Sequence, residues 1–307
     1  MEPSQPAPSR SRARALSTTL GKHVGGVPAA AAAASAPAPA LRWRGAAVLA
    51  CAAAYTLLFA FRWQATSPLF LGLFPALYLA LPLKALPALL LSSLARLPSA
   101  APAGAALAES AVGQYKLCVA RGLLASAAGD VLLDLCELPG LEDAAFLAGL
   151  ACFLAAHVLY AQGFYATAQR PLSALLGVAC ALPSALVASY LARHIQASPV
   201  HAPLLGPVCV YTCVITLMWY LSLARDEGGG LRAYYLTAAG ATLFLASDVA
   251  LAFGKFAPPP LHPDSGEVRW WFSSPKVVVM VTYYAAQSLL ACGAWGTAEA
   301  RPKAKRL

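Results

Sequence analysis

The sequence predicts an all-α fold, a polytopic bundle of eight transmembrane helices with both termini in the cytosol. First, 59% of the 307 residues are apolar and 11% are charged, whereas soluble domains are about 25% charged. Second, apolar stretches of about 20 residues, the length that crosses a bilayer as a helix, recur along the chain. Third, the Lys and Arg residues gather on one side when these stretches are threaded through a membrane.

The eight predicted spans form a membrane domain over residues 46–298. The first is short, and the second is long enough to tilt and contains Pro75, Pro82 and Pro87, which neighbouring helices or waters can accommodate. The spans cover residues 46–61, 69–94, 117–138, 144–164, 172–192, 204–224, 234–254 and 277–297.

Residues 1–45 are predicted to form a disordered basic tail. They are rich in Ala, Pro, Ser and Arg, and Glu2 is their only acidic residue. A transit peptide is less favoured, since eight spans follow and no cleavage signal is present. The one substantial loop, Gly254 to Pro275, contains Trp270 and Trp271, which are typical of a membrane interface.

The positive-inside rule predicts the orientation. With the N-terminus in the cytosol, fifteen Lys and Arg residues lie on the cytosolic side and five on the opposite side. An even number of spans also places residues 299–307, a short basic tail, in the cytosol. Its end, Lys303-Ala-Lys305-Arg306-Leu307, resembles the dilysine signal that returns membrane proteins to the endoplasmic reticulum, although a generic positive-inside cluster explains it equally well.

The net charge of +9 does not indicate a nucleic-acid partner, because the basic residues lie beside apolar spans and orient them. The eight cysteines include no CxxC pair and lie mostly within apolar stretches. They are therefore expected to be packing residues, with no cofactor and no metal site.

Two aspartates lie inside apolar spans. Asp130 lies in GLLASAAGDVLLDL (122–135) and Asp248 in GATLFLASDVALAF (240–253). A carboxylate near the middle of a bilayer costs at least ~2.5–3.5 kcal/mol, so it persists where it faces the protein interior or a wet cavity. Asp130 and Asp248 are thus the candidate catalytic residues.

The depths of the polar residues follow from a helical rise of ~1.5 Å per residue, taking each span's centre as the midplane. Asp130 and Asp248 lie ~4 Å and ~6 Å to the lumenal side in two spans that run in the same direction, so we expect them to share a depth and face each other. Lys84 and His157 lie ~4 Å to the cytosolic side. Contact between His157 and either aspartate therefore requires tilt or a shifted boundary, and Lys84 and His157 are assigned to headgroup contact or packing.

Helical phase places Ser126, Asp130, Asp134 and Glu137 on one face. We expect Asp134 and Glu137 to be solvated interfacial groups and only Asp130 to be buried. Arg121 falls on the opposite face and is expected to reach the cytosolic interface.

The remaining polar residues of the spans are candidate substrate-binding residues. Tyr283 and Gln287 share a helix face and suit a hydrogen-bonding set for the carboxylates, although membrane helices also use such groups to bind one another. Lys255, on the same face as Asp248, holds a phosphate or marks the helix end. The full set is Lys84, Ser126, His157, Tyr160, Ser247, Lys255, Tyr283 and Gln287.

Four segments in this order resemble the YhhN-type lysoplasmalogenase family of integral membrane proteins. They are GLLASAAGDVLL (122–133), FLAGLACFLAAHVLY (146–160), LFLASDVALAFGKF (243–256) and VTYYAAQSLL (281–290). The resemblance extends from about Ala46 to Ala298, and the family's two aspartates match Asp130 and Asp248.

The resemblance implies hydrolysis of the vinyl ether bond of lysoplasmalogens, which releases a fatty aldehyde and glycerophosphoethanolamine or glycerophosphocholine. One carboxyl group, kept protonated by burial, serves as general acid, and the other stabilises the cation and activates water, as in glycosidases. The implied partner is a lysophospholipid from the bilayer. Headgroup preference, oligomeric state and the identity of the acid stay open.

Three other interpretations remain. Paired membrane aspartates also serve proton-coupled transporters. A receptor or scaffold leaves both aspartates unexplained. A metal site would require His157 to approach both aspartates.

Overall fold

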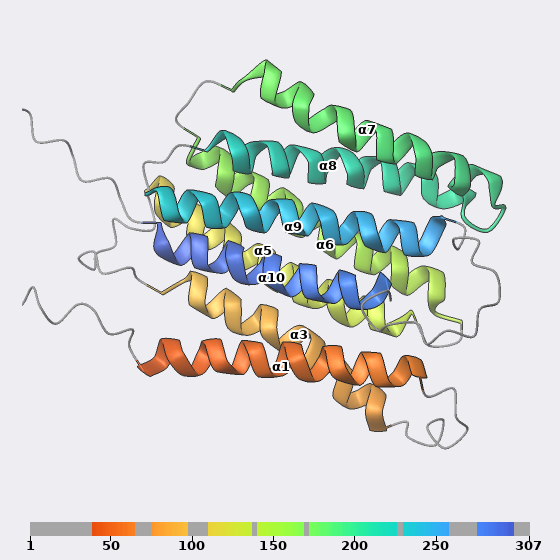
Figure 1. The fold of residues 1–307 in the computed structure, drawn as a ribbon, viewed down its shortest axis with the longest axis horizontal. Helices are drawn as coiled ribbons and strands as arrows, with labels where there is room; N and C mark the ends of the chain where they lie inside the picture. Colours follow the sequence, from red (N-terminus) through yellow and green to blue (C-terminus); the bar gives the residue numbers. More distant parts are fainter. Residues whose placement is uncertain are drawn as a thin grey trace, which may run out of the picture. The chain divides into compact units, whose positions relative to one another are not determined.

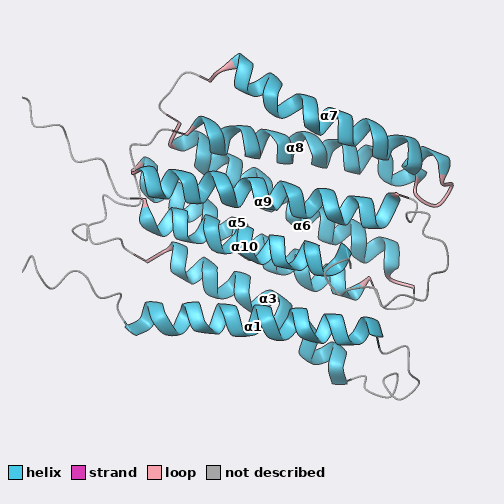
Figure 2. Ribbon diagram, in the orientation of Figure 1, coloured by secondary structure: helices cyan, strands magenta, loops and turns pink. Residues whose placement is uncertain are grey.

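The computed structural model describes residues 39–64, 75–97, 110–136, 140–168, 172–225, 230–257 and 275–297. All regular structure in these ranges is helical, without strands (Figure 2), so the predicted all-α class is confirmed. The elements are α1 (Pro39–Gln64), α3 (Pro75–Ala95), α5 (Ala111–Leu135), α6 (Glu142–Ala166), α7 (Ala174–Ala197), η2 (Ala202–Leu204, a 3₁₀ turn), α8 (Leu205–Ala224), α9 (Leu231–Phe256) and α10 (Pro275–Gly296).

The helices begin where local chemistry favours a start. Pro39, Pro75 and Pro275 each occupy the first position of a helix, where proline has a suitable φ and its missing N–H is not needed. Ser110 and Ser173 cap α5 and α7 by accepting a hydrogen bond from the backbone N–H three residues on.

Three helix boundaries differ from the predicted spans by five residues or more. The helix α5 begins at Ala111, six residues before the predicted span. The helix α1 begins at Pro39, so residues 39–45, assigned to the tail, are helical. The helix α7 continues to Ala197, five residues beyond the predicted span. The rest of the predicted tail, the Trp270 loop and the basic C-terminal segment lie outside the described residues.

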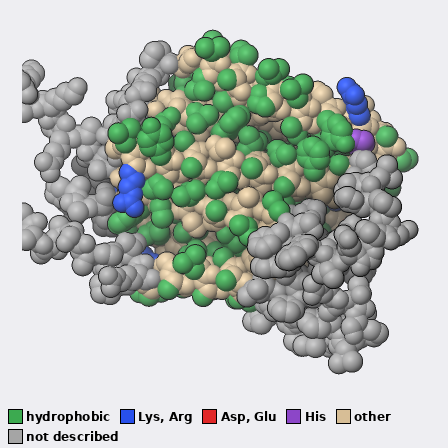
Figure 3. Space-filling model, in the orientation of Figure 1, with side chains coloured by type: hydrophobic (Ala, Val, Ile, Leu, Met, Phe, Trp, Pro, Cys, Tyr) green, Lys and Arg blue, Asp and Glu red, His purple; other side chains and the backbone are tan. Residues whose placement is uncertain are grey.

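Five helical segments in the described part of the chain are long and apolar enough to cross a membrane: α6, α7, residues 202–224, α9 and residues 277–296. The helix α3 adds a shorter apolar stretch, Leu81–Ala95. Apolar side chains are spread over much of the surface that Figure 3 shows. On α7, the side chains of Leu175, Val178 and Leu186 are more than half exposed. A multi-pass membrane protein explains such a surface, because lipid solvates it.

The helices lie side by side along a similar direction (Figure 1). The helix α5 packs against α3 and α6, α9 packs against α8 and α10, and α10 also contacts α3 and α5. Glycines allow the closest approaches, because Gly122 meets Tyr160 of α6 and Gly240 meets the α10 backbone at Ala286 and Leu290. The polar residues of α3, α5, α6, α9 and α10 are thereby brought into one interior.

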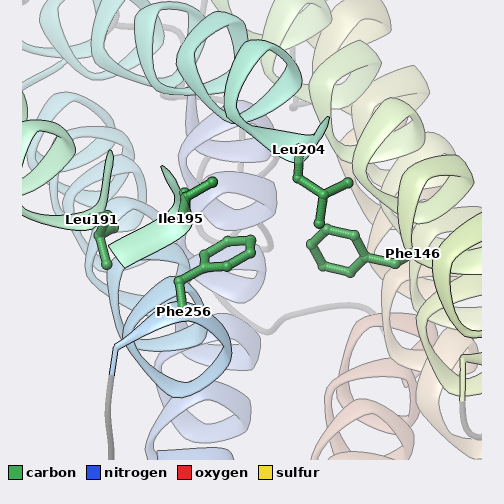
Figure 4. Packing of buried hydrophobic residues seen from close by; sticks show 5 residues of the cluster. All are labelled: Phe146, Leu191, Ile195, Leu204 and Phe256. Carbon is green, nitrogen blue, oxygen red and sulfur yellow. The ribbon is translucent and has the colours of Figure 1, made fainter. Parts of the chain in front are cut away.

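An apolar cluster fixes the C-terminal end of α9 about two turns beyond Asp248. Its buried members come from α6, α7, η2 and α9 (Figure 4): Phe146, Leu191, Ile195, Leu204 and Phe256. The Phe146 and Phe256 rings meet edge to face, with centroids 6.3 Å apart. This contact ties α9 to the start of α6.

Candidate functional site

Three polar residues of α5 are buried on one helix face. Ser126, Asp130 and Asp134 follow each other at one-turn intervals and are 0%, 2% and 8% exposed. The predicted common face is confirmed for these three, and Glu137 lies outside the described residues. Arg121 is exposed, as its position off this face predicts.

The expectation that Asp134 is a solvated interfacial group was wrong. Lys84 of α3 lies with Nζ 2.7 Å from Asp134 Oδ1, and the Tyr55 hydroxyl of α1 donates to the same oxygen at 2.9 Å. Both charged side chains are nearly inaccessible, at 9% and 10% exposure. Asp134 is buried because it has a cation and a hydroxyl donor, the condition under which a protein interior accepts a charge.

Lys84 is held by more than its ion pair. Its ammonium lies 5.7 Å from the centre of the Tyr55 ring, and the Tyr284 hydroxyl of α10 donates to its backbone carbonyl at 3.3 Å. The assignment of Lys84 to headgroup contact or packing did not anticipate this ion pair. Lys84 instead links α3 to the polar face of α5.

Asp130 accepts a hydrogen bond from Tyr283 of α10, with Oη 2.6 Å from Oδ2. This contact agrees with the expectation that α10 provides a hydrogen-bonding partner for a carboxyl group. One turn along α10, Gln287 accepts a hydrogen bond from Tyr160 of α6 at 2.9 Å. The Tyr160 hydroxyl is also 3.5 Å from Ser126 Oγ, so α5, α6 and α10 share one polar interior.

Asp248 has a different set of partners. Its Oδ2 accepts a hydrogen bond from Tyr211 of α8 at 2.5 Å and lies 3.2 Å from His157 Nε2. The same His157 nitrogen is 2.8 Å from the Tyr211 hydroxyl, so the three groups form a closed triangle. Sequence reasoning missed Tyr211, although a tyrosine within an apolar span was a usable signal.

The placement of His157 away from both aspartates was wrong. That placement assumed that every helix centre lies at one level, which put His157 and Asp248 on opposite sides of the midplane. Membrane helices tilt on average ~20°, and their side chains reach along the axis. The contact shows that α6 and α9 are offset enough to bring His157 to Asp248.

Contacts between aromatic rings link the partners of the two carboxyl groups. Phe244 of α9 contacts both Tyr283, with ring centroids 5.5 Å apart, and His157, at 4.7 Å. Among the described residues no hydrogen bond joins Asp130 to Asp248. Each aspartate therefore has its own partners, and a packed aromatic layer connects the two sites.

Two other candidates have structural contacts. Ser247 donates to the Val279 carbonyl of α10 at 3.0 Å and so joins α9 to α10. Lys255 in the last turn of α9 lies 4.1 Å from the centre of the Phe146 ring. Both positions suit helix packing.

Two buried nitrogens of the polar interior, His157 Nδ1 and Gln287 Nε2, have no hydrogen-bond partner among the described residues. Each is a polar atom of a fully buried side chain, which is unusual unless a water or ligand completes it. Within the described ranges, no group of three His, Cys, Asp or Glu side chains is suited to a metal ion. His157 Nε2 lies 3.2 Å from Asp248 Oδ2, and among the described residues no hydrogen bond joins His157 to Asp130.

The residues of the polar interior lie within a segment of the chain that matches a known protein family. The YhhN family matches residues 79–294, which is more than two thirds of the chain and includes both aspartates and their partners Tyr283, Tyr211 and His157. The chain belongs to the YhhN family.

Several curated proteins are similar in sequence. The lysoplasmalogenase TMEM86B of Sus scrofa is 34% identical over 183 residues, covering 60% of this chain and 66% of the relative. TMEM86B of Homo sapiens is 30% identical over 198 residues, covering 64% and 72%. Lysoplasmalogenase TMEM86A of Bos taurus is 30% identical over 176 residues, covering 56% and 63%. The chain thus spans about two thirds of the length of the curated relatives it matches, and no solved structure matches it.

Proposed function

We propose that this YhhN protein is a lysoplasmalogenase, a hydrolase that cleaves the vinyl ether bond of alkenyl glycerophosphoethanolamine or glycerophosphocholine. The observation that carries the proposal is the family match over residues 79–294, which includes both Asp130 and Asp248. The named relatives are lysoplasmalogenases of both types, TMEM86A and TMEM86B. A membrane-embedded site suits a single-chain lipid that enters from the bilayer.

The chemistry requires an acid and a base. Protonation of the distal alkene carbon gives an oxocarbenium ion, and water adds to the carbon that carries the ether oxygen. The resulting hemiacetal collapses as a proton moves to the glyceryl oxygen, so one water yields one aldehyde and one alcohol. General acid and base groups typically contribute 10²–10⁴-fold each to such steps.

Asp130 and Asp248 suit these two roles because their surroundings differ. Asp130 is 2% exposed, whereas the Asp248 side chain is 16% exposed, accepts from Tyr211 and lies 3.2 Å from His157 Nε2. Two carboxyl groups in unlike settings divide acid and base work in glycosidases, which also pass through an oxocarbenium-like transition state. This mechanism uses no metal or cofactor.

Gln287 is the substrate-binding candidate that the contacts favour most. Its Oε1 is fixed by Tyr160, and its buried Nε2 is left to donate to a substrate oxygen or an ordered water. The other proposed substrate contacts are Ser126, His157, Tyr160, Ser247, Lys84, Lys255 and Tyr283.

The proposed topology has eight spans with both termini in the cytosol, a membrane domain over 46–298, and basic tails at 1–45 and 299–307. The excess of Lys and Arg on one side supports it. Residence in the endoplasmic reticulum membrane is part of this proposal. Glycosylation-site insertion into each predicted loop measures this topology directly.

The function is tested with purified protein in detergent, given an alkenyl lysophospholipid or its acyl counterpart. A lysoplasmalogenase releases fatty aldehyde from the alkenyl lipid and leaves the acyl lipid intact. A proton-coupled transporter releases neither product in detergent. A lysophospholipase frees fatty acid from the acyl lipid, and either of these results would reject the proposal.

A further inference from the structure

Three charged groups meet at one buried face of α5: Asp130 and Asp134 of α5, and Lys84 of α3. If all three are ionised, their charges do not cancel. Lys84 and Asp134 form an ion pair, and Asp130 lies one turn away, with Cβ atoms about 5–6 Å apart at this spacing. Two carboxylates and one ammonium carry a net negative charge. Burying an uncompensated charge costs several kcal/mol, so one carboxyl group is expected to hold a proton.

The contacts identify which carboxyl group holds it. Asp134 Oδ1 lies 2.7 Å from the Lys84 ammonium and also accepts from Tyr55, the arrangement that stabilises a carboxylate. Asp130 accepts one hydrogen bond, from Tyr283 to Oδ2, and no described side chain donates to its Oδ1. Oδ1 is therefore the atom free to carry the proton.

The titratable groups around Asp130 come from four other helices. Tyr55 comes from α1, Tyr160 and His157 from α6, Asp248 from α9, and Tyr283 and Tyr284 from α10. Of these, His157 is 3.2 Å from Asp248 and serves that carboxyl group. Lys116, also buried on α5, precedes Asp130 by fourteen residues, about 21 Å along the helix. Lys84, already paired with Asp134, is therefore the described cation that acts on Asp130.

The contacts of the Asp248 carboxyl group differ from those of Asp130. The Tyr211 hydroxyl donates to Asp248 Oδ2, His157 Nε2 lies 3.2 Å from the same oxygen, and the Asp248 side chain is 16% exposed. The two aspartates of the proposed reaction thus differ in their hydrogen-bond partners and in their exposure before substrate arrives.

We propose that Asp130 is the proton donor and Asp248 the water activator, and that the Lys84–Asp134 ion pair is a positioning pair that keeps the proton on Asp130. The proposal rests on the proposed lysoplasmalogenase activity. The Asp130 proton moves to the alkene carbon, and Asp248 takes a proton from the attacking water. Asp248 then passes that proton to the glyceryl oxygen, and the hemiacetal hydroxyl returns its proton to Asp130.

Infrared spectroscopy of the detergent-purified full chain tests the protonation without substrate. A protonated carboxyl group has a C=O stretching band that shifts in D₂O. The band should be present in the wild type, absent in Asp130→Asn and retained in the matched control Asp248→Asn. Loss of the band in Asp248→Asn, or its persistence in Asp130→Asn, would overturn the assignment.

Charge-changing variants test the ion pair. Asp134→Asn leaves Lys84 to compensate Asp130, so the band should vanish and aldehyde release should fall by about 10²-fold or more. The double variant Lys84→Met/Asp134→Asn removes both charges, so the band should return. If Asp134→Asn folds and keeps the band, or if the folded double variant lacks it, the pair does not control Asp130.

The two measurements separate this inference from the proposed function. Absence of aldehyde release by the wild type rejects the lysoplasmalogenase, whatever the spectrum shows. Aldehyde release without an Asp130 band rejects the assignment of the proton and leaves the enzyme. Thermal unfolding of each variant in detergent verifies that it is folded, and the double variant is informative even if the single variant unfolds.

Discussion

The Tyr211 hydroxyl lies 2.5 Å from Oδ2 of Asp248, and the two residues come from adjacent helices, α8 and α9. His157 of α6 approaches the same oxygen at 3.2 Å, so one carboxyl oxygen is held from two sides. The other oxygen, Oδ1, is left to act on water. Hydrogen bonds that fix a catalytic carboxylate preorganise it for the transition state.

Tyr211→Phe should therefore lower kcat by about 10–100-fold, because a hydrogen bond to a charged group contributes about 1.5–3 kcal/mol and each 1.36 kcal/mol is tenfold in rate. Aldehyde release in detergent measures it. Tyr220→Phe on the same helix is the control, since its hydroxyl bonds the Ser173 carbonyl at the exposed surface. Equal rates for the two variants would show that Tyr211 has no part in the reaction.

The two aspartates should behave as one unit. Asp130→Asn and Asp248→Asn should each reduce aldehyde release to background, and the double variant should be no slower than either, because removing one member already disables the step. Single-turnover measurements on folded protein provide the rates. Near-normal turnover by either properly inserted single variant contradicts the paired-carboxylate mechanism.

The deuterium content of the released aldehyde shows whether the alkene carbon is protonated. In D₂O the released aldehyde should contain one deuterium on the carbon next to the carbonyl, because that carbon receives the acid's proton. Immediate reduction with borohydride prevents exchange, and mass spectrometry counts the label. An aldehyde without deuterium would mean that no group in exchange with the solvent protonates the alkene carbon, and the acid role would be lost.

The sequence predicted the helices well because their signals are local. Apolar stretches located every helix of the described chain, and one-turn spacing placed Ser126, Asp130 and Asp134 on one face. The cost of an intramembrane carboxylate correctly indicated that Asp130 is buried.

The partners of these groups were harder to predict, because they depend on how helices tilt and offset. Asp134 was expected to be solvated, since the sequence does not show that Lys84, fifty residues earlier, lies 2.7 Å away. His157 was placed at the wrong depth for Asp248 for the same reason, and Tyr211 was not considered. Contacts between distant helices are set by side-chain packing, which periodicity does not report.

The packing of α9 against α10 gives a stability prediction far from the aspartates. A Cβ added at Gly293 would lie 2.4 Å from Thr237 Oγ1 and 3.2 Å from the Ala233 carbonyl oxygen. Thr237 Oγ1 also accepts a hydrogen bond from Arg225 Nη1 at 2.9 Å, so it has little freedom to move. Gly293→Ala should lower stability by about 1–3 kcal/mol, the usual cost of overpacking.

Thermal unfolding in detergent measures the effect, with Gly206→Ala of α8 as the control. No atom lies within 4 Å of a Cβ at Gly206, so this variant should match or exceed the wild type, because Ala is the better helix former. Thr237 precedes Asp248 by eleven residues, about 16 Å along α9, so the folded Gly293→Ala protein should retain its rate of aldehyde release. Equal unfolding midpoints for the two variants would mean that α9 and α10 accommodate the added methyl group without loss of stability. The close approach at Gly293 would then not hold Thr237 and Arg225 in place.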